Sequence, residues 1–510
     1  MPKRNLLIGI DSGTQSTKVL VTEAKTGKVH GEAAQAYDLI KGLPAGAKEQ
    51  HPETWRKATS KCIKAALKAA KAQASEVRAI GISGQQHGFV PLDKKGEVIR
   101  PAKLWCDTAT AAECDEITSK LGGAKKTIKA LGNSVLPGFT APKILWLKNH
   151  EPKNFKKLAT ILLPHDYLNH WLTGRAVMEF GDASGTALLD VRKRKWCSKA
   201  LDAIDADLAD KLPPLISSDQ PVGTLCAKTA KELGLNTDVI VSAGGGDNMM
   251  GAIGTGNTEE GVITASFGTS GTIYACAEKP VVDPQGEIAA FCDSTNRWLP
   301  LLCTMNVTVA TEMVRNRFDW NHDKFAKAVK KIPAGSDGLL LVPYLEGERT
   351  PNVPEGTGVF FGNNNRTFDR AHYARAAMEG VTLGMNYGLR RLAELGVRPT
   401  QIRATGGGAK SKIWRQIMAD VFNTEVVTLK VSEGAAYGGA LQALWCWRRQ
   451  AGDNISIADI TAQFVTLNHR ETAEPIEANA DMYAEMQLLQ DEVSSSLRGA
   501  FQRHRAIVNG

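Results

Sequence analysis

Residues 6–22 read LLIGIDSGTQSTKVLVT, and residues 262–274 read VITASFGTSGTIY. Each segment is an apolar run, a turn that contains Gly and Thr, and a second apolar run, which indicates two strands joined as a hairpin. Gly13 in the first turn and Gly268 in the second lie 255 residues apart, half of the 510-residue chain. A repeat at this spacing predicts a duplicated α/β domain.

The boundary between the two copies is expected in the Gly-rich stretch 251–256. A chain of 510 residues is too long for one ordinary core, which also favours two domains. We therefore predict an N-terminal domain over residues 1–252 and a C-terminal domain over residues 253–510. Apolar and helical patterns predict further strands at 77–82, 339–342 and 402–405, and helices at 52–74, 372–395 and 477–504.

The composition is that of a water-soluble globular protein, with 43% hydrophobic and 23% charged residues. The 62 basic and 54 acidic residues leave a net charge of +8, which suits anionic small substrates. We see no concentrated basic stripe for nucleic acid and no apolar run long enough to cross a membrane. The nine cysteines are scattered without a C-x-x-C pair, which predicts a protein of the reducing cytoplasm.

Three Gly-rich turns are candidates for binding phosphates or a nucleotide, since the chain lacks a P-loop motif. A tight hairpin can direct successive backbone N–H groups at an anion, and the turns at 12–14 and 268–271 add hydroxyl donors. Residues 406–409, Gly-Gly-Gly-Ala, lie between a predicted strand and a predicted helix, where glycine permits close approach of a ring or ribose. A single Gly-Thr turn is more often a plain hairpin. The pair at half-chain spacing favours a shared cleft.

Two carboxylates stand at the ends of predicted strands. Asp11 ends the first apolar run, where it is either a turn residue or a carboxylate that holds Mg²⁺ through water. Asp247 follows the glycines 244–246 and is either a helix N-cap or a general base for a sugar hydroxyl. Three successive glycines are more than a cap needs, which favours the catalytic interpretation.

A dense polar loop follows the predicted strand at 77–82. Residues 84–88 read Gly-Gln-Gln-His-Gly, and the amides and imidazole offer donors and acceptors for a polyol. A lone histidine is usually structural. Because His87 lies in a Gly-flanked loop at the end of a strand, the sequence favours neither the structural nor the sugar-binding interpretation. Trp105 and Asp107 could add an aromatic face and a carboxylate to such a site, although a buried structural Trp is the simpler alternative.

At these residues the sequence resembles the FGGY family of carbohydrate kinases, over nearly the whole chain. Residues 8–14 resemble the first phosphate motif of that family, residues 267–271 its second, and residues 406–409 its adenosine motif. Residues 138–150, GFTAPKILWLKNH, match a family signature, and residues 244–248 match the segment that holds the catalytic Asp. The resemblance implies two actin-like, ribonuclease H-like domains around an interdomain cleft, with sugar bound mainly to the first and ATP to the second.

The resemblance also implies roles for individual residues. Asp247 is expected to be the catalytic base, and Asp11 and Asp247 to hold Mg²⁺. Ser12, Gly13, Thr14, Gly268, Thr269, Ser270, Gly407, Gly408 and Ala409 are expected to bind ATP and its phosphates. Gln86, His87, Trp105, Asp107, Asp247 and Asn248 are expected to contact the sugar.

The loop at 84–88 and the segment 343–351, PYLEGERTP, resemble the xylulokinase subfamily, although Gln86 stands where that subfamily has Met. This implies ATP-dependent phosphorylation of D-xylulose to D-xylulose 5-phosphate, in pentose catabolism. A kinase for another pentulose or pentitol, such as ribulose or ribitol, is the alternative within the class. An actin-like ATPase chaperone or filament protein is the alternative outside it. The expected partners are the sugar and ATP, without nucleic acid or membrane, and a homodimer is left open.

Overall fold

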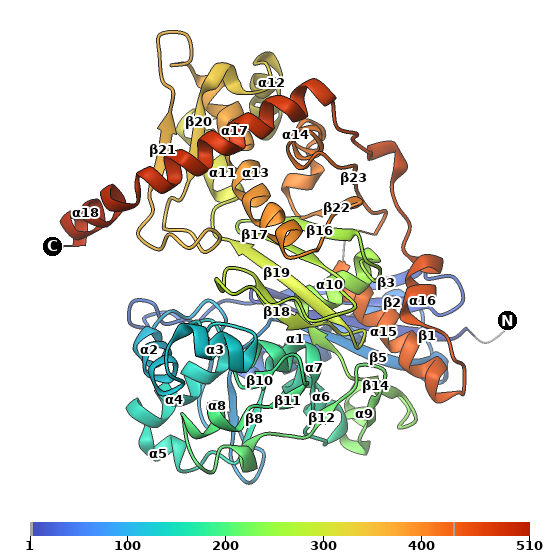
Figure 1. Cartoon of the computed structure of the whole chain (residues 1–510). Helices are drawn as coiled ribbons and strands as arrows, with labels where there is room; N and C mark the ends of the chain where they lie inside the picture. The colour runs from blue at the N-terminus through green and yellow to red at the C-terminus, as the bar shows by residue number, and fades with distance from the viewer. Residues whose placement is uncertain (1–3, 432–433, 510) are drawn as a thin grey trace. The chain divides into compact units, whose positions relative to one another are not determined.

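The computed structural model describes residues 4–431 and 434–509 and divides into two compact units (Figure 1). The first unit runs to Glu259 and includes Cys276–Leu299 and Glu433–Val465. The second unit contains Glu260–Ala275, Pro300–Ser432 and Thr466–Gly510. Segments from the second half of the chain therefore complete the first unit.

The first unit is built on a sheet with the strand order β13-β14-β5-β1-β2-β3, in which β15 also pairs with β5. Strands β1 (Leu6–Ser12) and β2 (Ser16–Glu23) are antiparallel with Ile8 opposite Val21, which confirms the predicted hairpin. Strand β5 (Val77–Gly84) runs parallel to β1 on its other side. The other strands of this sheet are β3 (Val29–Ala36), β13 (Pro221–Thr224), β14 (Ile240–Ser242) and β15 (Gly245–Gly246).

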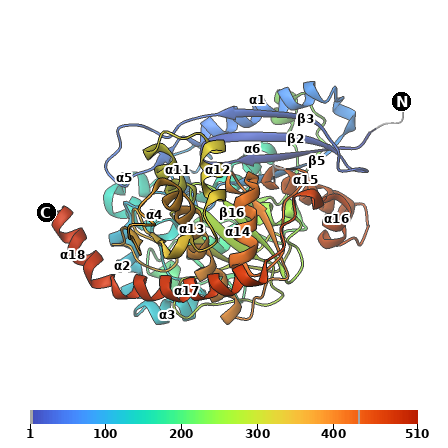
Figure 2. The same cartoon turned by 90° about the horizontal axis from the view of Figure 1, so that it is seen from above.

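Helices cover both faces of this sheet, as the view in Figure 2 shows for α1 and α15. Helix α1 (Pro52–Ala69) packs on β2 and β3, and its buried side chains include Trp55 and Ile63. Helix α15 (Gly434–Gln450) packs on β1 and β5 from the opposite face. Strand β1 lies between these layers, and its apolar residues 6–10 are buried on both faces of the sheet.

Helix α10 (Asp247–Thr255) crosses α15 at very short distance. A Cβ atom on Gly438 would lie 1.8 Å from the backbone oxygen of Met250, and one on Gly254 would lie 1.7 Å from that of Gly434. Only glycine fits where two helix backbones approach this closely. The contact fixes α10, and with it Asp247, against the sheet.

The second unit repeats the arrangement of the first around a sheet with the order β19-β17-β16-β22-β23. Strands β16 (Val262–Phe267) and β17 (Gly271–Ala275) form the second predicted hairpin, with Ala265 opposite Ile273. Strand β22 (Gln401–Thr405) runs parallel to β16, as β5 does to β1. The duplication predicted from the two turns is therefore present in the strand topology.

The remaining elements are short or lie around these sheets. The first unit also contains α2 (Ala111–Lys120), α3 (Ala124–Leu131), α4 (Thr140–His150), α5 (Pro152–Phe155), α6 (Pro164–Thr173), α7 (Phe180–Ala183), α8 (Ser198–Asp202), α9 (Ala227–Leu233), α16 (Ile457–Phe464), β4 (Glu49–Gln50), β6 (Val90–Leu92), β7 (Ala102–Lys103), β8 (Thr160–Leu162), β9 (Met178–Glu179), β10 (Leu189–Asp190), β11 (Lys195–Trp196), β12 (Leu215–Ile216) and β18 (Ala289–Cys292). The second contains α11 (Thr308–Arg317), α12 (His322–Lys331), α13 (Arg370–Glu394), α14 (Lys412–Phe422), α17 (Glu477–Ser496), α18 (Arg498–Asn509), β20 (Leu340–Pro343), β21 (Gly358–Phe361) and β23 (Val426–Val427), and β19 spans Trp298–Thr304.

Two predicted helices differ from the structure at their ends. Helix α1 ends at Ala69 instead of residue 74, because the chain turns at Lys71, which has a φ of +49°. The single C-terminal helix predicted at 477–504 is two helices, α17 and α18, which meet at Leu497. Within the described part of the chain, no helix combines the length and apolar character needed to cross a bilayer.

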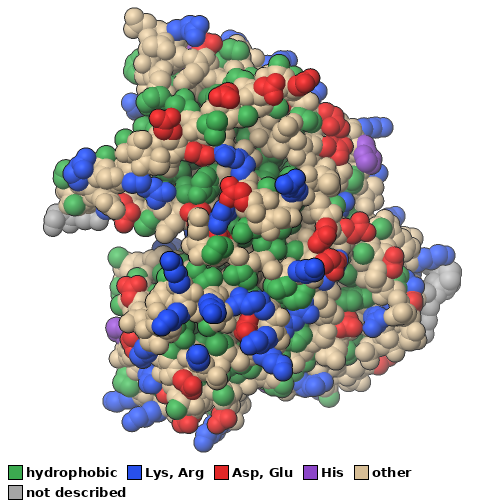
Figure 3. Space-filling model, viewed as in Figure 1, with side chains coloured by type: hydrophobic (Ala, Val, Ile, Leu, Met, Phe, Trp, Pro, Cys, Tyr) green, Lys and Arg blue, Asp and Glu red, His purple; other side chains and the backbone are tan. Residues whose placement is uncertain are grey.

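Figure 3 shows Lys and Arg side chains gathered over the part of the first unit that carries α3 and the β10–β11 hairpin. Lys125, Lys126 and Lys129 are exposed on α3, and the hairpin contributes the basic run 192–195. Part of this run serves packing: the guanidinium of Arg194 lies 4.1 Å from the centre of the Trp298 ring. The overall charge balance did not predict this local cluster.

Candidate active site

Three strand ends meet at one edge of the first unit's sheet. Strand β1 is parallel to β5 with Asp11 opposite Ser83, and β15 is parallel to β5 with Gly246 opposite Gly84. The carboxyl ends of parallel strands lie at the same edge, so Asp11, the loop after β5 and Asp247 emerge together. The hydroxyl of Ser83 donates to Asp11 Oδ1 at 3.2 Å. The polar residues predicted from separate motifs thus lie at one edge of this sheet.

Asp247 is the first residue of α10, and Gly246 holds the N-cap position. Asp247 Oδ1 accepts from the backbone N–H of Asn248 at 2.8 Å and from the Asn248 side-chain amide at 3.1 Å. Burial raises the pKa of Asp247 to about 7, and the Asp11 and Asp182 carboxylates add to the shift. A carboxyl group with this pKa can take up and release a proton near neutral pH.

The three glycines before Asp247 make room for atoms of the protein itself. A Cβ on Gly246 would lie 2.6 Å from Cγ of Gln86, and one on Gly245 would lie 2.3 Å from the hydroxyl oxygen of Ser294. Gly244 has a φ of +72° and passes close to the carbonyl of Ile82. The close approach at Gly246 brings the loop after β5 against the start of α10.

Gln86 and Asn248 join the polar loop to α10. The side-chain amide of Asn248 donates to Gln86 Oε1 at 2.6 Å, and Gln86 Nε2 lies 3.1 Å from the sulfur of Met249. Both Asn248 contacts, to Gln86 and to Asp247, orient the amide between the loop and the carboxylate. Gln86, Asn248 and Asp247 therefore form one connected polar surface.

His87 follows Gln86 in the left-handed region, with a φ of +60°. Its ring packs near Phe139 and Phe291, with centroid distances of 5.0 and 5.3 Å. The side chain is 9% exposed, and Asp182 Oδ1 lies 3.3 Å from its Nδ1 atom. The histidine is held on several sides at the edge where Asp247 emerges.

Trp105 and Thr14 connect the first Gly-Thr turn to this site. The indole N–H of Trp105 donates to the Thr14 hydroxyl at 2.9 Å, and that hydroxyl donates to Gln85 Oε1 at 3.1 Å. Asp107 is fully buried and accepts from the backbone N–H groups of Lys48 and Ala109 and from the Lys103 ammonium at 3.0 Å. The carboxylate of Asp107 thereby fixes the segment that carries Trp105.

In the second unit, the turn at 268–270 is accessible and its carbonyls are anchored. The carbonyl of Gly268 accepts from the N–H of Thr308 at 2.9 Å, and that of Thr269 accepts from the N–H of Val307 at 3.1 Å. Thr269 is exposed. The start of α11 holds the turn in place while the Thr269 side chain faces outward.

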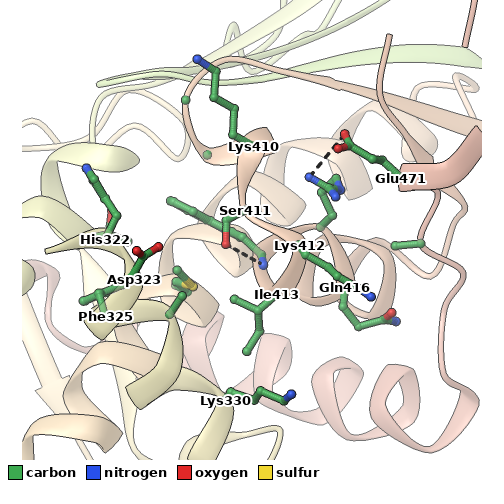
Figure 4. A pocket seen from close by; sticks show the side chains of 18 of the residues that line it. His322, Asp323, Phe325, Lys330, Lys410, Ser411, Lys412, Ile413, Gln416 and Glu471 are labelled. Carbon is green, nitrogen blue, oxygen red and sulfur yellow. Dashed lines mark hydrogen bonds and ion pairs between the residues drawn. The ribbon is translucent and has the colours of Figure 1, made fainter. Parts of the chain in front are cut away.

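A pocket of about 1300 Å³ lies beside the predicted adenosine motif in the second unit. Gly407 and Gly408 line it, and a Cβ on Gly407 would meet open space. Arg415 donates to the carbonyl of Ala409 at 2.7 Å, which holds the motif against α14. Figure 4 shows side chains of α12 on one side of the pocket and of α14 on the other, and the labelled residues are His322, Asp323, Phe325, Lys330, Lys410, Ser411, Lys412, Ile413, Gln416 and Glu471.

Comparison with family models matches both halves of the chain. The N-terminal domain model of the FGGY family of carbohydrate kinases matches residues 6–254, and its C-terminal domain model matches residues 263–447. The xylulose kinase of Haemophilus influenzae is 44% identical over 446 residues, which cover 86% of this chain and 90% of that protein. The xylulose kinase of Bacillus subtilis is 37% identical and covers 86% and 87%.

Solved structures agree with this match. The xylulose kinase from Bifidobacterium adolescentis is 30% identical and superimposes with a TM-score of 0.81, covering 95% of this chain and 99% of that one. The xylulose kinase from Rhodospirillum rubrum is 25% identical and gives a TM-score of 0.88 over 98% and 100%. The family models and these relatives all indicate a carbohydrate kinase.

Proposed function

Because the chain belongs to the FGGY family of carbohydrate kinases, whose members use ATP as phosphoryl donor, we propose that its sugar is D-xylulose and its product D-xylulose 5-phosphate. The observation that carries this proposal is the 44% identity to the Haemophilus influenzae xylulose kinase over most of both chains. Membership in a sugar-kinase family excludes the chaperone or filament alternative. In the cell, the product would feed pentose catabolism.

Asp247 is the proposed general base, which takes the proton of the C5 hydroxyl as that oxygen attacks the γ-phosphate. The raised pKa of the carboxyl, about 7, matches a group that must accept and later release a proton near neutral pH. The two donations from Asn248 to Oδ1 fix the orientation of the carboxylate.

Asp11 and Asp247 are the proposed ligands of Mg²⁺. The negative charge of Asp11 raises the pKa of Asp247, so the two carboxylates stand close enough to repel each other. Such a pair fits Mg²⁺, which prefers one or two carboxylates together with water and phosphate oxygens. Among the described residues there is no group of three or more His, Cys, Asp or Glu side chains that could hold a metal. When bound, Mg²⁺ would neutralise charge on the transferred phosphoryl group.

The proposed ATP contacts come from the two Gly-Thr turns and the glycine motif beside the large pocket. Backbone N–H groups and hydroxyls of the turns suit phosphate oxygens, and the pocket beside Gly407 suits the adenosine. The lysines and the two arginines of its lining add positive charge for the triphosphate. The proposed set is Ser12, Gly13, Thr14, Gly268, Thr269, Ser270, Gly407, Gly408 and Ala409.

Gly407→Leu tests the nucleotide half of the proposal. The new side chain would point into open space in the pocket, so the fold should be unaffected while adenosine is displaced. We expect KM for ATP to rise about tenfold or more, which corresponds to about 1.4 kcal/mol, with an unchanged melting temperature. KM for the sugar is the internal control. An unaltered KM for ATP in the folded variant would place the adenosine elsewhere.

The proposed sugar contacts are Gln86, His87, Trp105, Asp107, Asp247 and Asn248. Gln86, Asn248 and Asp247 form the connected polar surface, and Trp105 offers an aromatic face beside it. Asp107 would act by fixing the Trp105 segment, since its own oxygens already accept three donors.

Identification of the product tests the proposed chemistry: ³¹P NMR should show coupling of the new phosphate to the C5 methylene protons. A phosphate on any other carbon would contradict the assigned attacking hydroxyl.

We also propose a cytoplasmic location. All nine cysteines lie in the described ranges and are free thiols. A protein that keeps this many thiols reduced fits a reducing compartment. Non-reducing electrophoresis of the protein drawn directly into alkylating agent should show no disulfide.

A further inference from the structure

His87 has an unfavourable backbone conformation for its residue type. A non-glycine residue at φ +60° is uncommon and is retained where its surroundings hold it. Here the contacts come from both ends of the residue and from both sides of its ring. The groups that supply them lie in or beside α4, α7 and β18, outside the loop itself.

The carbonyl of His87 is held by α4. It accepts from Lys143 Nζ at 2.8 Å and from the Thr140 hydroxyl at 3.1 Å. Lys143 is fully buried and also donates to the carbonyl of Gly138 at 2.6 Å. Burial lowers the pKa of Lys143 to about 7. Its two carbonyl partners accept two of the N–H groups of the amine.

The other end of His87 is held by Asp182 of α7. Asp182 Oδ1 accepts from the backbone N–H of His87 at 3.3 Å and lies 3.3 Å from its Nδ1 atom. Burial alone would raise the pKa of Asp182, but the contacts with His165 and His87 outweigh it and lower that pKa to about 2. A charged carboxylate beside Nδ1 favours the proton on that nitrogen, and in this tautomer Nε2 is an acceptor.

A second histidine holds Asp182 in turn. Asp182 Oδ2 lies 3.2 Å from Nδ1 of His165. The Nε2 atom of His165 in turn lies 2.9 Å from Asp166 Oδ1. On the remaining side of the His87 ring, a Cβ on Gly185 would lie 1.9 Å from Cε1. Residues outside the loop therefore fix both the ring position and the backbone of His87.

We propose that Lys143 and Asp182 are positioning residues that clamp His87 from its two ends and so set the sugar preference of the site. The proposal rests on the assignment of His87 to the sugar under the proposed function. Neither residue needs to touch the sugar. Their effect would be to present one nitrogen of one histidine tautomer at a fixed place, where it can distinguish the configuration of a single hydroxyl.

Lys143→Met tests the carbonyl side of the clamp. It keeps the length of the side chain and removes both donors, which leaves the Thr140 hydroxyl as the remaining side-chain donor to the His87 carbonyl. We expect kcat/KM for the sugar to fall about 5- to 150-fold, because the loop is then held less firmly. KM for ATP should stay within about twofold. Thr140→Val removes only one donor and should give a smaller change in the same direction.

Lys148→Met is the matched control in the same helix. Lys148 also donates to a backbone carbonyl, that of Ile204, at 2.6 Å, but has no contact with the loop. Its sugar and ATP constants should equal those of the wild type. Unchanged kcat/KM for the sugar in folded Lys143→Met and Thr140→Val, or equal losses in KM for sugar and ATP, would overturn the carbonyl side of the clamp.

Asp182→Asn tests the ring side by a readout that does not depend on turnover. In ¹⁵N spectra of histidine-labelled protein, wild-type His87 should be protonated at Nδ1, and Asp182→Asn should shift the population toward Nε2. His87→Gln identifies the signal, since the protein has ten histidines. An unaltered tautomer in Asp182→Asn would overturn the role of Asp182. Failure of the proposed function would look different: the wild type itself would prefer another sugar, while the spectra still report the clamp.

Discussion

Asp247→Asn is expected to lower kcat about 10²- to 10⁴-fold, the usual contribution of a general base. The asparagine keeps the size of the side chain and its hydrogen bond with Asn248 but cannot take the proton of the attacking hydroxyl. KM for ATP and the melting temperature without ligands should change little. Steady-state kinetics together with a thermal melt measure all three quantities.

Asp238→Asn is the control for this variant, since Asp238 is exposed and lies before β14, away from the strand ends that form the site. It should retain wild-type kcat. A large fall in melting temperature for Asp247→Asn, with kcat of the folded fraction unchanged, would support the alternative in which the carboxylate merely stabilises the start of α10.

Gly438→Ala is expected to destabilise the first unit by about 3 kcal/mol, at the upper end of the usual cost of overpacking. The added methyl group would meet the backbone oxygen of Met250 at 1.8 Å, and backbone on both sides leaves no side chain that could rotate away. Helix α10 would have to shift, and Asp247 with it. We therefore expect a loss of activity along with the loss of stability, measured by calorimetry and by kcat at low temperature.

Gly384→Ala provides the comparison, because Gly384 is also inside a helix, α13, where a Cβ would meet ordinary contact distance at 3.5 Å. Replacing glycine by alanine in a helix with room for it should stabilise by about 0.5–1 kcal/mol. Equal melting temperatures for the two variants would show that the crossing of α10 and α15 tolerates a methyl group.

The core of the fold was predictable because its signals are local and repeated. The hairpins β1–β2 and β16–β17 are alternations of apolar runs and Gly-Thr turns, and each could be identified within about fifteen residues. Elements such as α7, with four residues, are too short to show a helical period. The return of residues 433–465 to the first unit is a matter of long-range contact, which a local pattern does not contain.

The candidate site was predictable to the same extent. Asp11, Gln86 and Asp247 lie at or just after the carboxyl ends of strands that share one edge, so their convergence follows from the topology. Lys143 and Asp182 could not be assigned, because a lysine is normally solvated and nothing near Asp182 in the sequence marks it as a partner of His87. The one available signal was the position of Lys143 within the segment 138–150, which resembles a family signature.

The most direct test of the proposed function is the choice of sugar in a coupled assay of ADP release. D-xylulose and D-ribulose differ only in the configuration at C3, and a site that pairs each hydroxyl leaves a buried group unsatisfied when one is inverted. This costs about 1–3 kcal/mol, so we predict that kcat/KM for D-xylulose exceeds that for D-ribulose about 5- to 150-fold, with ribitol also a poor substrate. A wild-type enzyme that prefers D-ribulose or a pentitol, or that releases ADP at the same rate without sugar, would contradict the account.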